Sequence, residues 1–124
     1  MEKLEHLGLV HIKNLRLRTI IGINDWERKN KQDVIINIKI RFNAARAGQT
    51  DCVEDTVNYK TLTKRIIQTV EQSQFYLVEK LAQVILDIAM ENPEVVKAWV
   101  EVEKPFALRF ADSVSIKLSA QRNA

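Results

Sequence analysis

The sequence predicts an α+β domain in which two helices cover one face of a four-stranded antiparallel sheet. Apolar and polar residues alternate along 34–42 and along 114–119, which is typical of strands covered on one face only. Between these segments, apolar residues recur at helical spacing over 59–70 and again from about residue 77. The predicted order is strand, strand, helix, helix, strand, strand, with both helices on one side of the sheet.

The first strand is predicted to change phase along its length. Val10 and Ile12 share one phase of the alternation, whereas Leu15 and Leu17 share the other. A change of phase around Asn14 indicates a β-bulge or a bend in a long first strand.

The two helices follow from their apolar stripes and from the residues that flank them. The first stripe begins after Thr56 or Asn58, either of which can cap a helix N-terminus. The second helix runs from about Leu77 and is expected to end near Asn92, because Pro93 disfavours helical geometry in the residue before it.

Three strands, 34–42, 98–103 and 114–119, leave one polar sheet face. The residues expected on it are Asn37, Lys39, Arg41, Lys97, Trp99, Glu101, Ser115, Lys117 and Ser119. A four-stranded sheet also has two unpaired edges, which a protein must hide, blunt or pair with another chain. Subunits joined edge to edge into a ring would remove these edges and leave the polar face lining a tunnel.

Length and composition indicate a single domain over residues 1–124, with its core over about 9–122. Residues 1–8 alternate charge and leucine and lack the apolar core of a signal peptide. No run approaches the roughly 18 apolar residues of a membrane span. Cys52 is the single cysteine, which excludes an internal disulfide and suits a reducing compartment. We therefore expect a cytoplasmic protein.

The net charge of +3 does not indicate a nucleic-acid-binding protein. Lys and Arg are scattered among acidic residues, and aromatic residues make up only 6% of the chain. Nucleic-acid binders usually cluster basic residues on one face, and RNA-binding sheets carry stacking aromatic residues. The composition favours a mixed, solvated surface that leaves room for a local basic patch facing an anionic small molecule.

Candidate functional residues gather in connecting segments, and each has an ordinary structural explanation when taken alone. The segments are 22–27, 55–59, 75–80 and 103–109. Glu79 suits a first helical turn because of the helix dipole, and Tyr59 can be a core aromatic residue. Glu27 and Lys104 can be solvated charges. No one of these residues identifies a function.

No metal or cofactor is predicted. The chain has only three Gly residues, too few for a Gly-rich phosphate loop. Its two histidines, His6 and His11, and its one cysteine give no zinc-ligand spacing. No serine lies in a nucleophile elbow. The remaining chemistry is metal-free acid–base catalysis by Lys, Tyr and Glu side chains.

Four short motifs together resemble those of the dihydroneopterin aldolase family. They are Ile21-Gly22-Ile23 with Glu27, then Thr56-Val57-Asn58-Tyr59, then Leu77-Val78-Glu79-Lys80-Leu81-Ala82, then Val102-Glu103-Lys104-Pro105. Their order and spacing match over about 12–122. Two further segments, 14–19 and 107–115, are more similar to the dihydroneopterin triphosphate epimerases of this family than to its aldolases. The aldolases typically carry an aromatic residue or His before the glycine and further prolines after the lysine. This chain has Ile20 and Ile21 before the glycine, and Phe106-Ala107-Leu108-Arg109 in the segment after the lysine.

The resemblance implies the tunnelling fold and a pterin substrate. In that fold, four subunits form a ring, two rings stack into an octamer, and active sites lie between neighbouring subunits. Glu79 would anchor the amino-pyrimidine edge of the pterin, and backbone amides near Leu77 and Val78 would help to read the ring. A carboxylate suits this edge because it accepts two charge-assisted hydrogen bonds. Further implied substrate contacts are Gly22, Ile23, Val57 and Tyr59.

The implied catalytic residues are Lys104, Tyr59 and Glu27. Lys104 would manage protons on the side-chain hydroxyl, Tyr59 would come from the adjacent subunit, and Glu27 would support the proton network. Removal of the 2′-hydroxyl proton lets the C1′–C2′ bond break, with the pterin ring as electron sink. Loss of the aldehyde makes the enzyme an aldolase, whereas recapture on its other face inverts C2′ and makes it an epimerase.

Selection of a triphosphate substrate requires basic residues beyond the pterin ring. Arg109, on the connection between the last two strands, is the leading candidate. Arg16, Arg18 and Lys29 are weaker ones. The alternative for Arg109 is a surface role or an ion pair with Asp112.

Two other functions remain open at this stage. One is dihydroneopterin aldolase proper, which releases 6-hydroxymethyl-dihydropterin and glycolaldehyde. The other is a non-catalytic pterin- or purine-binding module on the same fold. The joint presence of Glu27, Tyr59, Glu79 and Lys104 favours an enzyme over the binding module.

Overall fold

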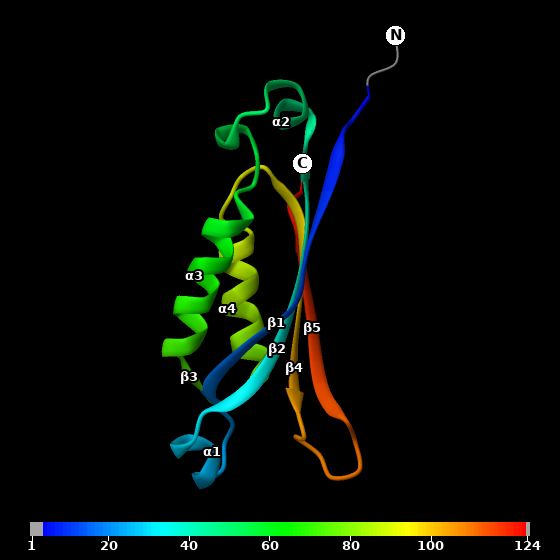
Figure 1. Ribbon diagram of the computed structural model, residues 1–124. Helices are drawn as coiled ribbons and strands as arrows, with labels where there is room; N and C mark the ends of the chain where they lie inside the picture. The colour runs from blue at the N-terminus through cyan, green and yellow to red at the C-terminus, as the bar shows by residue number, and fades with distance from the viewer. Residues whose placement is uncertain (1–3, 124) are drawn as a thin grey trace.

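The computed structural model describes residues 4–123 and confirms an α+β fold (Figure 1). Residues 1–3 and 124 of the expected domain lie outside the described part. The strands are β1 Leu7–Ile21, β2 Gln32–Asn43, β3 Gln74–Phe75, β4 Val95–Pro105 and β5 Ser113–Gln121. The helices are α1 Asp25–Lys29, α2 Ala45–Thr50, the 3₁₀ turn η1 Val53–Asp55, α3 Tyr59–Gln72 and α4 Val78–Ala89. All five strands belong to one sheet in the order β3-β1-β2-β4-β5.

The prediction of a four-stranded, purely antiparallel sheet was wrong in one respect. The link between α3 and α4 contains β3, which pairs in parallel with the end of β1 through Ile20–Gln74 and Ile21–Phe75. A two-residue strand is too short to show an alternating pattern, so the sequence carried no signal for it. The short helices α1, α2 and η1 in the connections were also not expected. The helix α4 ends at Ala89, three residues before the predicted Asn92.

The predicted bulge in the first strand is confirmed at Asn14. The register with β2 shifts between Ile12 and Leu15, and Asn14 itself has a left-handed backbone with φ of 52°. Its amide donates to Oδ1 of Asn37 at 3.0 Å, and the Asn37 amide group donates to Oδ1 of Asn14 at 3.2 Å. The bulge therefore restores the inward phase, so that Leu15 and Leu17 face the core as Val10 does.

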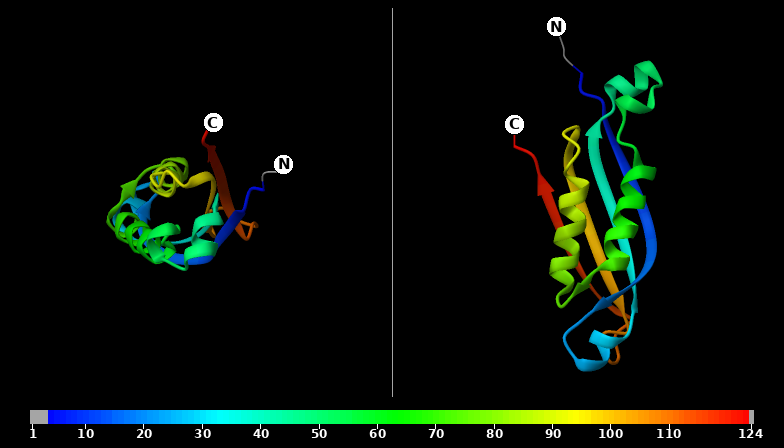
Figure 2. Two further views of the ribbon diagram at one scale, coloured as in Figure 1. Left: turned by 90° about the horizontal axis from the view of Figure 1, so that it is seen from above. Right: turned by 90° about the vertical axis from the view of Figure 1, so that its left-hand side faces the viewer.

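The core lies between α3, α4 and the covered sheet face (Figure 2). Even-numbered residues of β2 and, from Ala98 to Val102, of β4 point into it, as the alternation predicted, and the helices contribute their apolar stripes. The largest fully buried side chains include Ile36, Ile38, Ile40, Ile66, Val70, Leu81, Ile85, Val100 and Val102. Each contributes about 1.5–3 kcal/mol by leaving water.

Of the two predicted N-caps of α3, Thr56 and Asn58, the structure shows Asn58. Its side chain accepts hydrogen bonds from the Lys60 and Thr61 amides.

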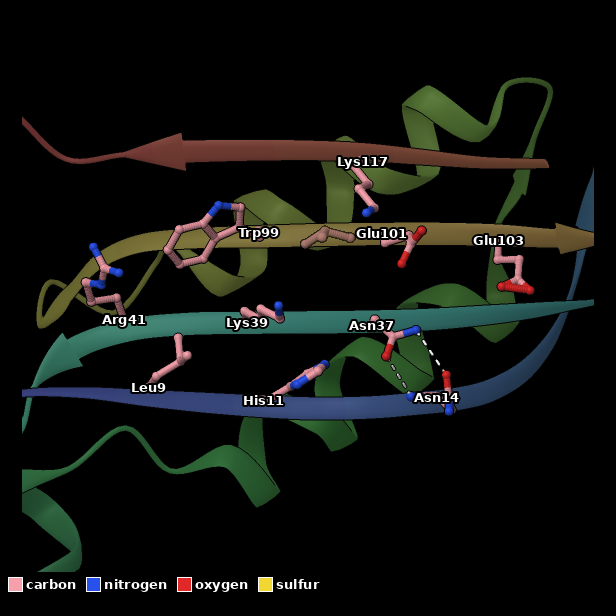
Figure 3. A pocket seen from close by; sticks show the side chains of 11 residues that line it. Leu9, His11, Asn14, Asn37, Lys39, Arg41, Trp99, Glu101, Glu103 and Lys117 are labelled. Carbon is pink, nitrogen blue, oxygen red and sulfur yellow. Dashed lines mark hydrogen bonds between the residues drawn. The ribbon is translucent and has the colours of Figure 1, made fainter. Parts of the chain in front are cut away.

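The opposite sheet face is polar and hollowed, as the strand patterns predicted (Figure 3). It holds a groove of about 610 Å³ whose floor is formed by β1, β2, β4 and β5 side chains. Two cations lie near Trp99, whose ring centroid is 5.4 Å from the Arg41 guanidinium carbon and 4.7 Å from the Lys97 ammonium. Within residues 4–123, β5 pairs on one side only, so its outer edge is free to pair.

Candidate active site

The turn after β1 places a carboxylate at one open end of the sheet. Asn24 caps α1, its side chain accepting from the Glu27 amide at 2.9 Å, and the Glu27 carboxylate accepts in return from the Asn24 amide at 3.4 Å. The same carboxylate accepts from the Ile23 amide at 3.2 Å. This reciprocal capping box fixes the Glu27 side chain against its own turn.

Gly22 is required because the Glu27 carboxylate lies directly against its backbone. Gly22 has φ of +128°, a conformation that L side chains rarely adopt. A Cβ atom at this position would lie 2.2–2.5 Å from the Glu27 carboxyl atoms. Glycine therefore lets the turn close over the carboxylate.

Lys104 occupies a core-facing position at the end of the sheet. In β4, Ala98, Val100 and Val102 point toward the helices and are buried, and Lys104 continues the same phase. Its ammonium bonds to Oε2 of Glu27, and the two side chains are only 13% and 14% exposed. Removing one partner of an ion pair this sheltered strongly destabilises the protein, because the other charge stays buried without a partner.

The surroundings of Glu27 keep it ionised. The hydrogen bond from Lys104 is the largest cause that lowers the pKa of Glu27 below its usual 4.5, and partial burial opposes it. The Asn24 amide and the Gln32 side chain, 3.4 Å from Oε2, lower the pKa further. Gln32 also donates to the Ile21 carbonyl at 2.7 Å, so it ties the carboxylate to β1. The site thus presents a charged lysine–carboxylate pair that can exchange protons with a bound hydroxyl.

The depressed pKa of Glu27 predicts how stability depends on pH. A carboxylate whose folded pKa lies below its unfolded value stabilises the protein above the unfolded pKa, and this contribution disappears as pH falls through the folded pKa. Glu27→Gln should therefore lower the free energy of unfolding by about 3 kcal/mol at neutral pH. The difference from wild type should shrink as pH falls below 4.5. Urea titrations of both proteins from neutral pH to below pH 4.5 measure the difference in their free energies of unfolding. A difference that does not change with pH would contradict the pairing of Glu27 with Lys104.

The start of α4 lies at the same end of the sheet, beside α1 and β3 (Figure 1). The Gly22 amide donates to the Phe75 carbonyl at 3.3 Å, which joins the β1 turn to the segment that leads into α4. No described side chain caps α4, whose N-cap is Leu77, so amides of its first turn are available to a ligand. Glu79 follows in that turn and is exposed.

The structure brings together most of the predicted site residues within one chain. Gly22, Ile23, Glu27, Leu77, Val78, Glu79 and Lys104 all lie at this end of the sheet. Tyr59 and Val57 do not join them. Helix α3 runs 14 residues from Tyr59 toward β3, about 20 Å, so Tyr59 lies at the far end of the domain. Tyr59 is 54% exposed there, whereas the Val57 side chain is buried in the core.

Arg109 lies at the tip of the β4–β5 hairpin, which also reaches the Lys104 end of the domain (Figure 1). The tip turns through left-handed Phe106 and Phe110, with φ of 60° and 71°, and the Phe106 amide donates to the Asp112 carbonyl at 3.2 Å. The Arg109 guanidinium lies 5.7 Å from the Phe110 ring centroid. Among the described residues it forms no ion pair with Asp112, so it remains available to an anion.

The weaker phosphate candidates differ in how far they are engaged. The Arg18 guanidinium pairs with Asp33 at 3.2 Å and donates to the Lys31 carbonyl at 3.1 Å. Arg16 and Lys29 are exposed. Arg18 would have to give up its own partner before it could bind a phosphate.

Sequence reasoning missed two residues that organise the site, Gln32 and Arg28. Gln32 precedes the predicted strand 34–42, and its role depends on the distance between β1 and the Glu27 carboxylate. Arg28 bridges the β1 turn and β3, and no local pattern predicted β3.

In residues 4–123, no group of three or more His, Cys, Asp or Glu residues could hold a metal ion. No helix in that range is both long and apolar enough to cross a membrane.

The α+β domain places a sheltered lysine–glutamate pair near the start of a helix that no described side chain caps. These features define a class of small domains suited to acid–base chemistry on a bound ligand. The chain belongs to the dihydroneopterin aldolase family, whose FolB model matches residues 10–119. This family is catalytic, and the chain is an enzyme.

Two relatives named dihydroneopterin triphosphate 2′-epimerase are 52% identical to this chain. The protein from Pseudomonas aeruginosa aligns over 116 residues, 94% of both chains. The protein from Escherichia coli aligns over 115 residues, 93% of this chain and 96% of its own. A solved structure, Escherichia coli dihydroneopterin aldolase in complex with neopterin, matches with a TM-score of 0.85 at 25% identity and covers 91% of this chain and 98% of that one. The epimerases are therefore about twice as similar in sequence as this aldolase.

Proposed function

We propose that this chain inverts C2′ of 7,8-dihydroneopterin triphosphate and yields dihydromonapterin triphosphate. The observation that carries the proposal is the Lys104–Glu27 pair beside the first turn of α4. The names of the 52% identical relatives specify the substrate and the outcome. The pterin complex of the aldolase supports a pterin ligand for this site.

In the proposed site, one group of residues binds the pterin ring and another performs the chemistry. Glu79 and the first-turn amides of α4 hold the amino-pyrimidine edge of the pterin, because a carboxylate accepts two charge-assisted hydrogen bonds there. The Lys104–Glu27 pair then faces the side chain of the substrate. Tyr59 of a neighbouring subunit closes the site.

The reaction balances without an added reagent. The Lys104–Glu27 pair takes the proton from the 2′-hydroxyl, the C1′–C2′ bond breaks, and its electron pair passes into the dihydropterin ring. The aldehyde fragment turns and presents its other face. The ring returns the electron pair to form C1′–C2′ again, and the 2′-oxygen recovers its proton with inverted configuration.

The second candidate is dihydroneopterin aldolase, which uses the same first step and lets the aldehyde leave. It is favoured only by the family as a whole and by the structural likeness to the Escherichia coli aldolase. Product analysis with dihydroneopterin and with its triphosphate separates the two functions. We expect monapterin triphosphate as the main product and little 6-hydroxymethyl-dihydropterin. Release of hydroxymethyl-dihydropterin as the main product from both substrates would favour the aldolase.

We also propose that the domain is a tunnelling-fold subunit of a ring, two of which stack into an octamer. The exposed apolar residues support contacts at both ends of the domain. Those near the site are Ile23, Trp26, Tyr76, Leu77, Phe106, Leu108 and Phe110, and those at the other end are Leu4, Leu7, Leu9, Val53 and Tyr59. The free β5 edge and the polar, hollowed sheet face fit a ring around a water-filled channel.

Shared active sites predict that two inactive variants restore each other. A site made of Lys104 from one subunit and Tyr59 from its neighbour is intact only when each comes from an unmodified copy. Lys104→Gln and Tyr59→Ala subunits that are unfolded, mixed equally and refolded should recover roughly a quarter of wild-type activity. Light scattering should show an oligomer. A stable monomer, or mixtures no more active than their parents, would contradict the shared site.

The phosphate tail should be selected by Arg109. A desolvated arginine–phosphate contact contributes roughly 1.5–3 kcal/mol, or about one to two powers of ten in affinity. Arg109→Ala should therefore lower kcat/KM for the triphosphate by that factor and barely affect free dihydroneopterin. Lys117→Ala, which removes an exposed cation from the middle of the polar sheet face, is the control. Equal losses on both substrates would assign Arg109 to structure, and no loss on either would move the phosphate site elsewhere.

A further inference from the structure

Arg28 makes an unusually complete set of contacts for a residue at the surface of a short helix. Its guanidinium donates to three backbone carbonyls: Gly22 at 3.1 Å, Phe75 at 3.0 Å and Gln74 at 2.7 Å. The guanidinium carbon also lies 3.9 Å from the centroid of the Tyr76 ring. Three of these four contacts join the β1 turn to the segment from Gln74 to Tyr76.

The acceptors of these hydrogen bonds lie on both sides of the proposed site. Gly22 precedes the turn that holds the Glu27 carboxylate, which bonds to Lys104. Gln74 and Phe75 form β3, and the chain continues from them directly into the first turn of α4 with Glu79. Arg28 therefore links the half of the site that performs the chemistry to the half that would bind the pterin.

Apart from the Thr19 hydroxyl, which donates to the Ser73 carbonyl at 2.9 Å, few contacts hold the strand that precedes α4 in place. The strand β3 has only two residues, and its pairing with β1 is limited to Ile20–Gln74 and Ile21–Phe75. The Gly22 amide adds one hydrogen bond to the Phe75 carbonyl, at 3.3 Å. Such a short strand is marginal without further support. The guanidinium adds two hydrogen bonds to this segment, to the carbonyls of Gln74 and Phe75.

We propose that Arg28 is a positioning residue that sets the pterin-binding start of α4 against the Glu27 turn. This inference rests on the proposed function of the same site. Arginine suits the role because its planar fork donates to several acceptors at once while its face stacks on an aromatic ring. A lysine carries the same charge as a single point and cannot bridge three carbonyls in this geometry.

The chain provides a matched control in Arg122. Its guanidinium also donates to three carbonyls, those of Val95 at 3.1 Å, Met90 at 2.7 Å and Asn92 at 3.4 Å. These contacts fasten the C-terminal end of α4, opposite the end that carries Glu79. Arg122→Ala thus removes the same kind of clamp from the same helix at the end that does not carry Glu79.

The test compares Arg28→Ala, Arg28→Lys and Arg122→Ala by kinetics and by direct binding of neopterin. Loss of Arg28 should raise KM and the neopterin Kd roughly ten- to hundredfold, because charge-assisted hydrogen bonds that order the binding segment are lost. The value of kcat should change much less, since the Lys104–Glu27 pair has its own supports. Added guanidinium should partly restore neopterin binding to Arg28→Ala. If Arg28→Ala does not fold, Arg28→Lys should show the same pattern, with KM and Kd raised and kcat changed much less. Arg122→Ala should leave KM unchanged.

Hydrogen exchange gives a reading that does not depend on turnover. Arg28→Ala should speed exchange of amides in 74–79 and leave those of β4 near Lys104 protected. Unchanged KM, Kd and exchange, or equal effects of Arg28→Ala and Arg122→Ala, would overturn the proposal. If the wild-type protein bound neopterin but formed no epimer, the proposed reaction would fail, whereas selective loss of binding and protection in Arg28→Ala would still support the clamp.

Discussion

Lys104→Ala should lower kcat for epimerisation by about 10²–10⁴-fold, the range that general acid–base catalysis contributes. The lysine occupies an inward-facing position of β4 and bonds to Glu27, so the substitution removes the cation of this pair. Pterin binding should persist, because Glu79 and the first turn of α4 are unchanged. Rapid-mixing kinetics and neopterin titration measure the two effects separately.

The control for this variant must account for the buried partner. Lys104→Ala leaves the Glu27 carboxylate without its cation, which destabilises the turn. Lys104→Gln keeps a hydrogen-bond donor for Glu27 and should lower kcat to a similar extent with less loss of stability. Lys117→Ala changes an exposed lysine of the same sheet and should have no comparable effect. A fully active Lys104→Gln enzyme would remove the lysine from the mechanism.

Glu79→Ala should mainly weaken pterin binding, by about a hundredfold. The carboxylate would accept two charge-assisted hydrogen bonds from the amino-pyrimidine edge, and both are lost together. Since the contact is the same in the ground state and the transition state, KM and Kd should rise while kcat stays within a few-fold. Isothermal titration with neopterin measures the Kd directly.

A glutamate elsewhere on the surface controls for the change in charge. Glu94 is exposed just before β4, away from the start of α4, so Glu94→Ala should bind neopterin as the wild type does. If Glu79→Ala bound neopterin normally and instead lost turnover, Glu79 would belong to the chemistry rather than to recognition of the ring.

The sequence predicted the elements whose signals are local and repeated. The strands β2, β4 and β5 alternate over six or more residues, so their covered face could be read directly. The bulge at Asn14 was visible because it changes the phase of that alternation. Helix α3 was visible from its stripe, although only the structure distinguished Asn58 from Thr56 as its cap.

What the sequence could not predict depends on distances between segments. Strand β3 has two residues and exists only because the link between α3 and α4 passes beside the end of β1. The role of Arg28 depends on the carbonyls of that strand, so it was also hidden. The resemblance implied that Tyr59 comes from an adjacent subunit, and within one chain the 14-residue helix α3 separates the Tyr59 end from Lys104. Only an arrangement of several copies can bring them together.

The most direct test of the account is whether the enzyme interconverts the two C2′ epimers from either side. Dihydroneopterin triphosphate and dihydromonapterin triphosphate are incubated separately, and the pterins are separated by chromatography after dephosphorylation and oxidation. The account predicts that both reactions converge on the same mixture of the two epimers, with total pterin side chain conserved and with Lys104→Gln blocking both directions. Depletion of both substrates to 6-hydroxymethyl-dihydropterin, or persistence of each substrate unchanged, would contradict it.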